Sequence, residues 1–134
     1  MKNTNRRKIE FSDQKGQSVT EFALALPILV LLLFAVIQFG ITFNNYVTLT
    51  DATRAGARKA AVSREQSNPS SLTATAVRSS AAGLIQTNLN VSVNSTWQPG
   101  ADVTVTATYP YKIKLLGIPL KQGFLTSTTT ERVE

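Results

Sequence analysis

The sequence contains no cysteine and no histidine. Their absence excludes disulfide bonds, thiolate zinc sites, cysteine nucleophiles and imidazole general bases. The carboxylates that remain, such as Asp51, Glu65 and Asp102, stand in no spacing typical of a catalytic centre. We therefore predict that the chain is not an enzyme and that it uses no cofactor, no metal and no small-molecule substrate.

The whole chain has a formal net charge of +6, and acidic residues are scarce at its start. Residues 1–16 hold only two acidic residues against five basic ones, which are Lys2, Arg6, Arg7, Lys8 and Lys15. A short basic flank of this kind is typical of the cytoplasmic side of a membrane-spanning helix, and a disordered basic tail is the alternative. Nucleic-acid binding is not expected, because no interleaving of basic and aromatic residues follows.

An uncharged apolar segment runs over residues 22–43, with Gln38 and Thr42 as its clearly polar side chains. About 20 helical residues cross the hydrocarbon core of a bilayer, whereas a cleavable secretory signal has a shorter apolar region. Pro27 predicts a bend one turn into the segment. A buried core helix is the alternative, but the rest of the chain has too little apolar material to surround one.

Glu21 stands at the start of this segment, where an ionised carboxylate costs at least a few kcal/mol unless it is paired or reaches water. If the chain were cleaved after Gly16, the α-amine of Gln17 would lie one helical turn before Glu21 on the same face. We predict that Glu21 pairs with such an amine, from its own chain or from a neighbour. An acid stabilised by the helix dipole, by about 0.3–1 kcal/mol, is an alternative compatible with this pairing.

Residues 16–27, GQSVTEFALALP, resemble the class III signal of type IV pilins and pseudopilins. They are most similar to the TadE-like proteins, minor pilins of the tight-adherence (Flp pilus) systems. The residues that fit that family's GQxxxEFALxLP pattern are Gly16, Gln17, Glu21, Phe22, Ala23, Leu24 and Pro27. A second patch, ATRAGARKAA at residues 52–61, is similar to the family's AAREGARxAA, although Ala55 replaces its usual Glu. The C-terminal strands, with a turn at Tyr109-Pro110, extend the resemblance loosely over almost the whole chain.

The resemblance implies a pilin-like subunit that a prepilin peptidase cleaves between Gly16 and Gln17. It further implies a role in assembling a Flp or type IV-like pilus for adherence or secretion, with other pilin-like subunits and membrane lipids as partners. The expected location is the bacterial cytoplasmic membrane, with the N-terminus in the cytoplasm, the C-terminal domain outside, and incorporation into an extracellular pilus as a further step. The alternative is an unprocessed, single-pass binding or sensory module. Small residues suit helix packing in membranes, and those expected to serve it here are Ala23, Ala25, Pro27, Ala35 and Gly40, beside Glu21 and Phe22.

The predicted fold class is α+β, in a pilin-like arrangement of a long helix, a second helix and about three antiparallel strands. Its expected parts are a leader (1–16), a transmembrane and assembly helix (17–43), an extracytoplasmic extension of the helix (44–66) and a small domain (67–134). We expect one helix over residues 18–62, with an apolar stripe of Val47, Leu49, Ala52, Ala55, Ala60 and Ala61. Arg54, Arg58 and Lys59 are expected on or near one face, as a solvated surface or as contacts to lipid phosphates or partner carboxylates.

In the small domain, Asn68-Pro69 predicts a turn, and Ser70 or Ser71 the N-cap of the second helix. The expected apolar stripe of that helix comprises Leu72, Ala76, Val77, Ala81, Leu84 and Ile85. Alternation over residues 89–93 and 103–109, joined by 98–101, predicts a β-hairpin, and residues 124–132 predict a third strand. Residues 112–122 fit no element. We expect Leu115, Leu116 and Ile118 to pack under the sheet, with a contact to the membrane surface or a partner as the alternative.

Overall fold

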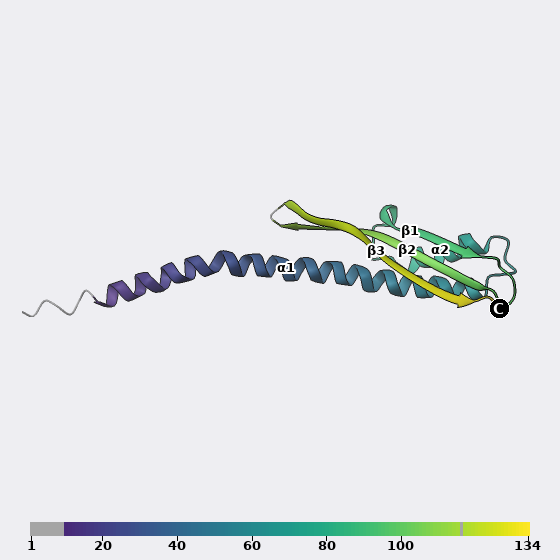
Figure 1. Ribbon diagram of the computed structural model, residues 1–134, viewed down its shortest axis with the longest axis horizontal. Coiled ribbons are helices and arrows are strands. Elements are labelled where there is room, and N and C mark those ends of the chain that lie inside the picture. The colour runs from purple at the N-terminus through teal and green to yellow at the C-terminus, as the bar shows by residue number, and fades with distance from the viewer. Residues whose placement is uncertain (1–9, 116) are drawn as a thin grey trace, which may run out of the picture. The chain divides into compact units, whose positions relative to one another are not determined.

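The structure is a computed structural model that describes residues 10–115 and 117–134. Its elements are α1 (Glu10–Ala61), α2 (Pro69–Ser80), a short 3-10 helix η1 (Gln86–Asn88), β1 (Asn90–Ser95), β2 (Asp102–Leu115) and β3 (Ile118–Arg132) (Figure 1). The strands form one antiparallel sheet in the order β1-β2-β3. The predicted α+β fold is therefore confirmed. The chain divides into an N-terminal unit that ends at Ile37 and a C-terminal unit, Gln38–Glu134.

Helix α1 begins earlier than the sequence predicted. It starts at Glu10 instead of residue 18 and ends at Ala61, within one residue of the expected end. Residues 10–17 contain no proline to interrupt the helix, and the acids Glu10 and Asp13 suit the positive end of the helix dipole. Four basic residues of the predicted leader, Lys2, Arg6, Arg7 and Lys8, lie outside the described residues. Pro27 lies inside α1, and the bend there remains a prediction.

The second half of α1 buries one stripe in the C-terminal unit. The buried residues recur every three or four positions and are Leu49, Ala52, Thr53, Gly56, Ala57 and Ala60, and Ser63, just beyond the end of the helix, is buried as well. The predicted stripe was partly wrong, because Val47 is 41% exposed and Ala55 and Ala61 are only partly buried. Thr53 was missed because it is polar, but its hydroxyl donates to the carbonyl oxygen of Leu49 at 2.7 Å and so enters the core satisfied.

Helix α2 is capped one turn earlier than expected. Asn68 is its N-cap, with the side-chain Oδ1 accepting from the backbone N–H of Ser71 at 3.1 Å, and Pro69 occupies the first helical turn. The expectation of Ser70 or Ser71 as the cap was therefore wrong. Of the predicted stripe, Val77, Ala81 and Leu84 are buried, whereas Leu72 is 37% and Ile85 61% exposed and Ala76 is only partly buried. The helix is also shorter than expected, because it ends at Ser80, before Ala81, Leu84 and Ile85. Thr73, which the stripe omitted, is fully buried.

The sheet packs its alternate residues into the core of the C-terminal unit. On β2 these are Val103, Val105, Ala107 and Tyr109, which join buried residues of α1 and α2. The opposite face is polar, and the hydroxyl pairs Thr104–Thr130 and Thr106–Thr128 lie across β2 and β3 at 3.0 and 3.1 Å. At the end of the chain Glu134 donates its backbone N–H to the carbonyl oxygen of Ala61 at 3.0 Å. The last residue is thereby attached to the C-terminal end of α1.

The strand β2 continues through the position where a turn was predicted. Pro110 pairs with Phe124 inside the β2–β3 ladder, and the last pair of the ladder is Leu115 with Ile118. Proline has no backbone N–H and is tolerated where one side of a strand has no paired neighbour. Pro110 meets this condition, because β1 pairs with β2 only as far as Thr108. Residues 112–122 therefore belong to a hairpin. Ile118 is 66% exposed and does not pack under the sheet, while Leu116 lies outside the described residues.

Gly56 marks the place where α1 and α2 approach most closely. A Cβ atom added to Gly56 would lie 2.2 Å from Cγ2 of Val77 and 3.6 Å from the carbonyl oxygen of Thr73. No real Cβ contact is that short, so any side chain at this position forces the helices apart. The glycine in the ATRAGARKAA patch is thus explained by close helix packing.

We expect Gly56→Ala to destabilise the folded C-terminal unit by about 1–3 kcal/mol, because the core there has no room for a methyl group. Thermal unfolding of the full chain in detergent, followed by circular dichroism, measures the effect. Gly83→Ala is the matched control, since a Cβ at Gly83 meets nothing within 4 Å. Combining Gly56→Ala with Val77→Ala removes the clashing Cγ2 and should cost less than the two single changes added together. If the free-energy changes of the two single variants added up to that of the double variant, this account would be contradicted.

Candidate membrane-anchoring and assembly site

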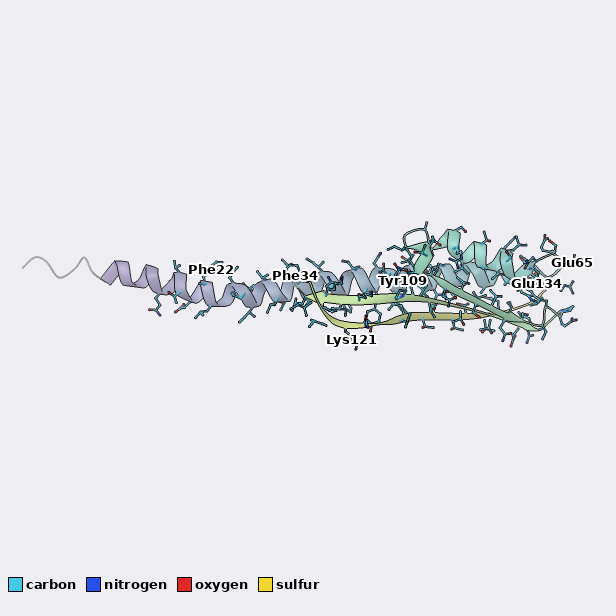
Figure 2. The ribbon with its side chains drawn as sticks, turned by 90° about the horizontal axis from the view of Figure 1, so that it is seen from above. Phe22, Phe34, Glu65, Tyr109, Lys121 and Glu134 are labelled. Atoms are coloured by element: carbon cyan, nitrogen blue, oxygen red, sulfur yellow. The ribbon has the colours of Figure 1, made fainter. Side chains whose placement is uncertain are left out.

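The apolar part of α1 is uncovered by the rest of the chain. Among the described residues, one helix is long and apolar enough to cross a membrane, and none of its most apolar stretch is buried. Phe22 is 60% exposed and Phe34 37%, and both project from α1 in Figure 2. A core helix of a soluble protein is covered by its own chain, which this stretch is not. The segment has the length and composition of a membrane span.

Glu21 is the only charged side chain between Lys15 and Asp51. Its Oε1 accepts a hydrogen bond from Nε2 of Gln17 at 3.0 Å, and both side chains are exposed. The contact shows that positions 17 and 21 share one face of α1, a turn apart, as the sequence predicted. A single neutral amide donor leaves most of the hydrogen-bonding capacity of a carboxylate open to other partners.

The bond between Gly16 and Gln17 lies inside α1 rather than at its start. The carbonyl oxygen of Gly16 accepts from Oγ1 of Thr20 at 2.9 Å, and a Cβ at Gly16 would meet nothing within 4 Å. The helix is therefore continuous through this bond, and the surroundings of Gly16 are open. A protease that cleaves there must first open at least one helical turn.

The small residues predicted to mediate helix packing are all exposed on α1; they are Ala23, Ala25, Pro27, Ala35 and Gly40. At roughly 100° per residue they point to several sides of the helix instead of forming one stripe. A set of this kind permits close approach of more than one neighbouring helix. It does not mark one dimer face.

The basic residues near the end of α1 are exposed and lie away from the buried stripe. Arg54 approaches Asp51 at 3.9 Å, with both side chains more than 60% exposed, so this ion pair contributes little to stability. Arg54 and Arg58 are one turn apart, whereas Lys59 is rotated by roughly 100° from Arg58. Only the two arginines therefore share a face. Whether they bind lipid phosphates or partner carboxylates stays a prediction.

The sequence interpretation assigned no element to the exposed end of the β2–β3 hairpin and gave a contact to the membrane surface or a partner only as the alternative. Leu120 and Phe124 are 63% and 74% exposed there, beside the exposed Lys112 and Lys121. The signal in the sequence was the coincidence of apolar residues and lysines over 112–124 with no acid among them. It was obscured because the segment was expected to fold under the sheet.

The described residues form one exposed apolar helix that is long enough to cross a membrane, followed by a small α+β unit. The family model described as TadE-like protein matches residues 16–58, which confirms the resemblance drawn from the sequence. The match supports a pilin-like protein associated with Tad pilus systems, a family that is generally not enzymatic. It begins at Gly16 and ends at Arg58, so the loose resemblance of the C-terminal strands stays a prediction. Neither the curated proteins nor the solved structures give a match to the chain.

Proposed function

We propose that the chain is a pilin-like subunit of a Tad (Flp) pilus system that a prepilin peptidase cleaves after Gly16 and that then takes part in assembling the pilus. One observation carries the proposal. Glu21 is the only charged side chain on an otherwise exposed apolar stretch of α1, and it contacts the residue that cleavage would turn into the new N-terminus. A membrane helix keeps such an acid at a cost unless the acid has a function.

The proposed cleavage is hydrolysis of the Gly16–Gln17 peptide bond. Water adds across the bond, which leaves a carboxylate on Gly16 and an ammonium group on Gln17. Glycine disfavours helix by up to about 1 kcal/mol relative to alanine, so the turn around Gly16 is the easiest place in this part of α1 to open. Cleavage also removes the basic leader, whose lysines and arginines hold the N-terminus on the cytoplasmic side.

The new ammonium group supplies Glu21 with a positively charged partner in addition to the Gln17 amide. In the membrane-embedded subunit the two groups on one chain neutralise each other across one helical turn. In an assembly, the carboxylate of one subunit meets the ammonium group of the next, and the pair fixes the axial position of one helix against its neighbour. Extraction from the bilayer is feasible only when other helices cover the apolar surface of α1, which small residues on several sides permit.

The measurement that separates this proposal from an unprocessed binding or sensory module is the intact mass of the protein extracted from membranes of its native host. The expected chain begins at Gln17, and other pilin-like chains purify with it. A chain that begins at Met1 or Lys2 and purifies alone would contradict the proposal. The measurement needs no substitution, so it is free of effects on folding.

A further inference from the structure

The β2–β3 hairpin projects beyond the rest of the sheet as a two-stranded arm. β1 ends its pairing with β2 at Thr108, whereas β2 and β3 remain paired as far as Leu115 and Ile118. Among the described residues at the end of the arm, large apolar side chains are exposed, with Ile118 at 66%, Leu120 at 63% and Phe124 at 74%. Isolated two-stranded hairpins are marginally stable in water, so an apolar arm of this length calls for a supporting surface.

The arm is also positively charged without compensation. Lys112, Lys114 and Lys121 are exposed, and the sequence has no acidic residue between Asp102 and Glu131. Across the ladder Lys112 faces Gln122, Lys121 faces Ile113, and Lys114 faces Pro119. The cross-strand neighbours of all three lysines are therefore uncharged, and the arm attracts anions.

The arm lies at the end of the C-terminal unit that adjoins the membrane anchor in the chain. Tyr111 and Lys112 line a groove together with Gln38 and Ile41, the first turn of α1 in this unit. The opposite end of the unit is marked by the bond between Glu134 and Ala61. Figure 2 shows Lys121 and Glu134 at opposite ends of the sheet. Gln38 directly follows the exposed apolar part of α1 in the sequence, so the arm lies at the end of the C-terminal unit where the chain enters it from the apolar segment.

We propose that the hairpin end, through its described residues 112–115 and 117–124, docks on anionic lipid headgroups of the membrane in which α1 is anchored. Ile118, Leu120 and Phe124 enter the interfacial layer, and the lysine ammonium groups pair with lipid phosphates. The β2–β3 ladder shifts register between Ile113 and Lys114, which leaves Leu120 without a Cα partner, and alternation from residue 121 onward places Lys121 and Phe124 on opposite faces of β3. Lysines around exposed apolar side chains are typical of segments that lie at a membrane surface, since long lysine stems reach the phosphates while apolar groups are buried.

The inference rests on anchoring of α1 but not on cleavage at Gly16 or on pilus assembly. Docking gives the C-terminal unit a second attachment to the bilayer, besides α1 itself. This attachment must be released before the subunit leaves the membrane. The arm is therefore a candidate point at which lipid composition affects that step.

The test uses the full, uncleaved chain in vesicles, with an environment-sensitive fluorophore on a single introduced cysteine. The absence of native cysteine makes the labelling specific. Gln122→Cys places the probe on the arm, and Gln98→Cys places it on an exposed loop at the other end of β2. Vesicles are made of phosphatidylcholine alone or with about a third of phosphatidylglycerol, and nitroxide-labelled lipid serves as the quencher.

We expect the Gln122 probe to be quenched about threefold or more strongly than the Gln98 probe in the anionic vesicles, with a blue-shifted emission. Neutral vesicles should reduce this difference, as should the combined change Lys112→Gln, Lys114→Gln and Lys121→Gln. Equal quenching at both positions would overturn the proposal. So would shielding of the Gln122 probe in detergent alone, or shielding that needs a second pilin-like subunit, since the arm would then pack on protein. Because uncleaved chain is used, failure here leaves the proposed processing untouched.

Discussion

Replacing Gly16 by leucine is expected to lower the cleaved fraction of the chain at least tenfold while leaving the chain in the membrane. A Cβ at Gly16 would meet nothing within 4 Å, so leucine fits the helix without a clash. Leucine also favours helix over glycine by up to about 1 kcal/mol, which opposes the opening that a protease needs. Its side chain further occupies the space beside the bond to be cut. Intact mass of membrane-extracted protein, from cells that carry the prepilin peptidase, measures the cleaved fraction.

Gly40→Leu is the matched control for this substitution. Gly40 lies in the same helix, and a Cβ there also meets nothing within 4 Å. The two variants therefore make the same change in chemistry and in helix propensity. The Gly40 variant should be cleaved like the unsubstituted chain, and a Gly16→Leu chain that still begins at Gln17 would show that the processing site has been misplaced.

The limits of α1 illustrate what the sequence determines and what it leaves open. Its C-terminal end was predicted to within one residue, because the polar segment with Asn68-Pro69 stops any helix there. Its N-terminal end was not, because the family resemblance drew attention to Gly16 as a boundary, whereas one glycine does not end a helix. Cleavage and secondary structure follow different chemistry, so a processing site need not coincide with a helix start.

The core of the C-terminal unit was predicted from residue type, and the errors follow from that choice. Leu49, Ala52 and Ala60 were correct, while Thr53 and Thr73 were missed although both are fully buried. Their hydroxyls donate to carbonyl oxygens one turn earlier, Leu49 and Pro69, so a threonine in a helix enters a core without an unpaired donor. Alternation alone identifies the strands, but not how far two of them continue beyond the third.

The spacing of residues in the candidate site follows from the sequence more directly than the extent of the sheet does, and the roles of those residues stay predictions. The spacing between Gln17 and Glu21 requires only a regular helix, and the structure brings their side chains into contact at 3.0 Å. The arm at residues 112–124 was not predicted, since proline and glycine there indicate a loop by composition. Its form depends on pairing between β2 and β3, which single-residue preferences do not encode.

Glu21→Ala is expected to lower incorporation of the subunit into pilus-type assemblies at least tenfold, while cleavage and membrane insertion continue. In a helix bundle the removal of one partner leaves the other charge buried and unpaired, which costs about 3–5 kcal/mol. Co-purification of other pilin-like chains and recovery in the sheared surface fraction measure incorporation. Asp51→Ala is the matched control, because Asp51 is the next acidic residue of α1 and its contact to Arg54 is exposed. It should assemble normally.

Glu21→Gln separates pairing from an effect of the helix dipole. Glutamine keeps the size of the side chain and a carbonyl that Gln17 can still approach, but it has no charge. If Glu21 interacted only with the helix dipole, Glu21→Gln would remove about 0.3–1 kcal/mol of interaction free energy. This is less than a tenfold change in an equilibrium constant. If it pairs with an ammonium group, glutamine leaves that group unneutralised, and the variant should fail as Glu21→Ala does. Incorporation of Glu21→Gln within a few fold of the unsubstituted chain would therefore contradict the pairing, even where cleavage after Gly16 is complete.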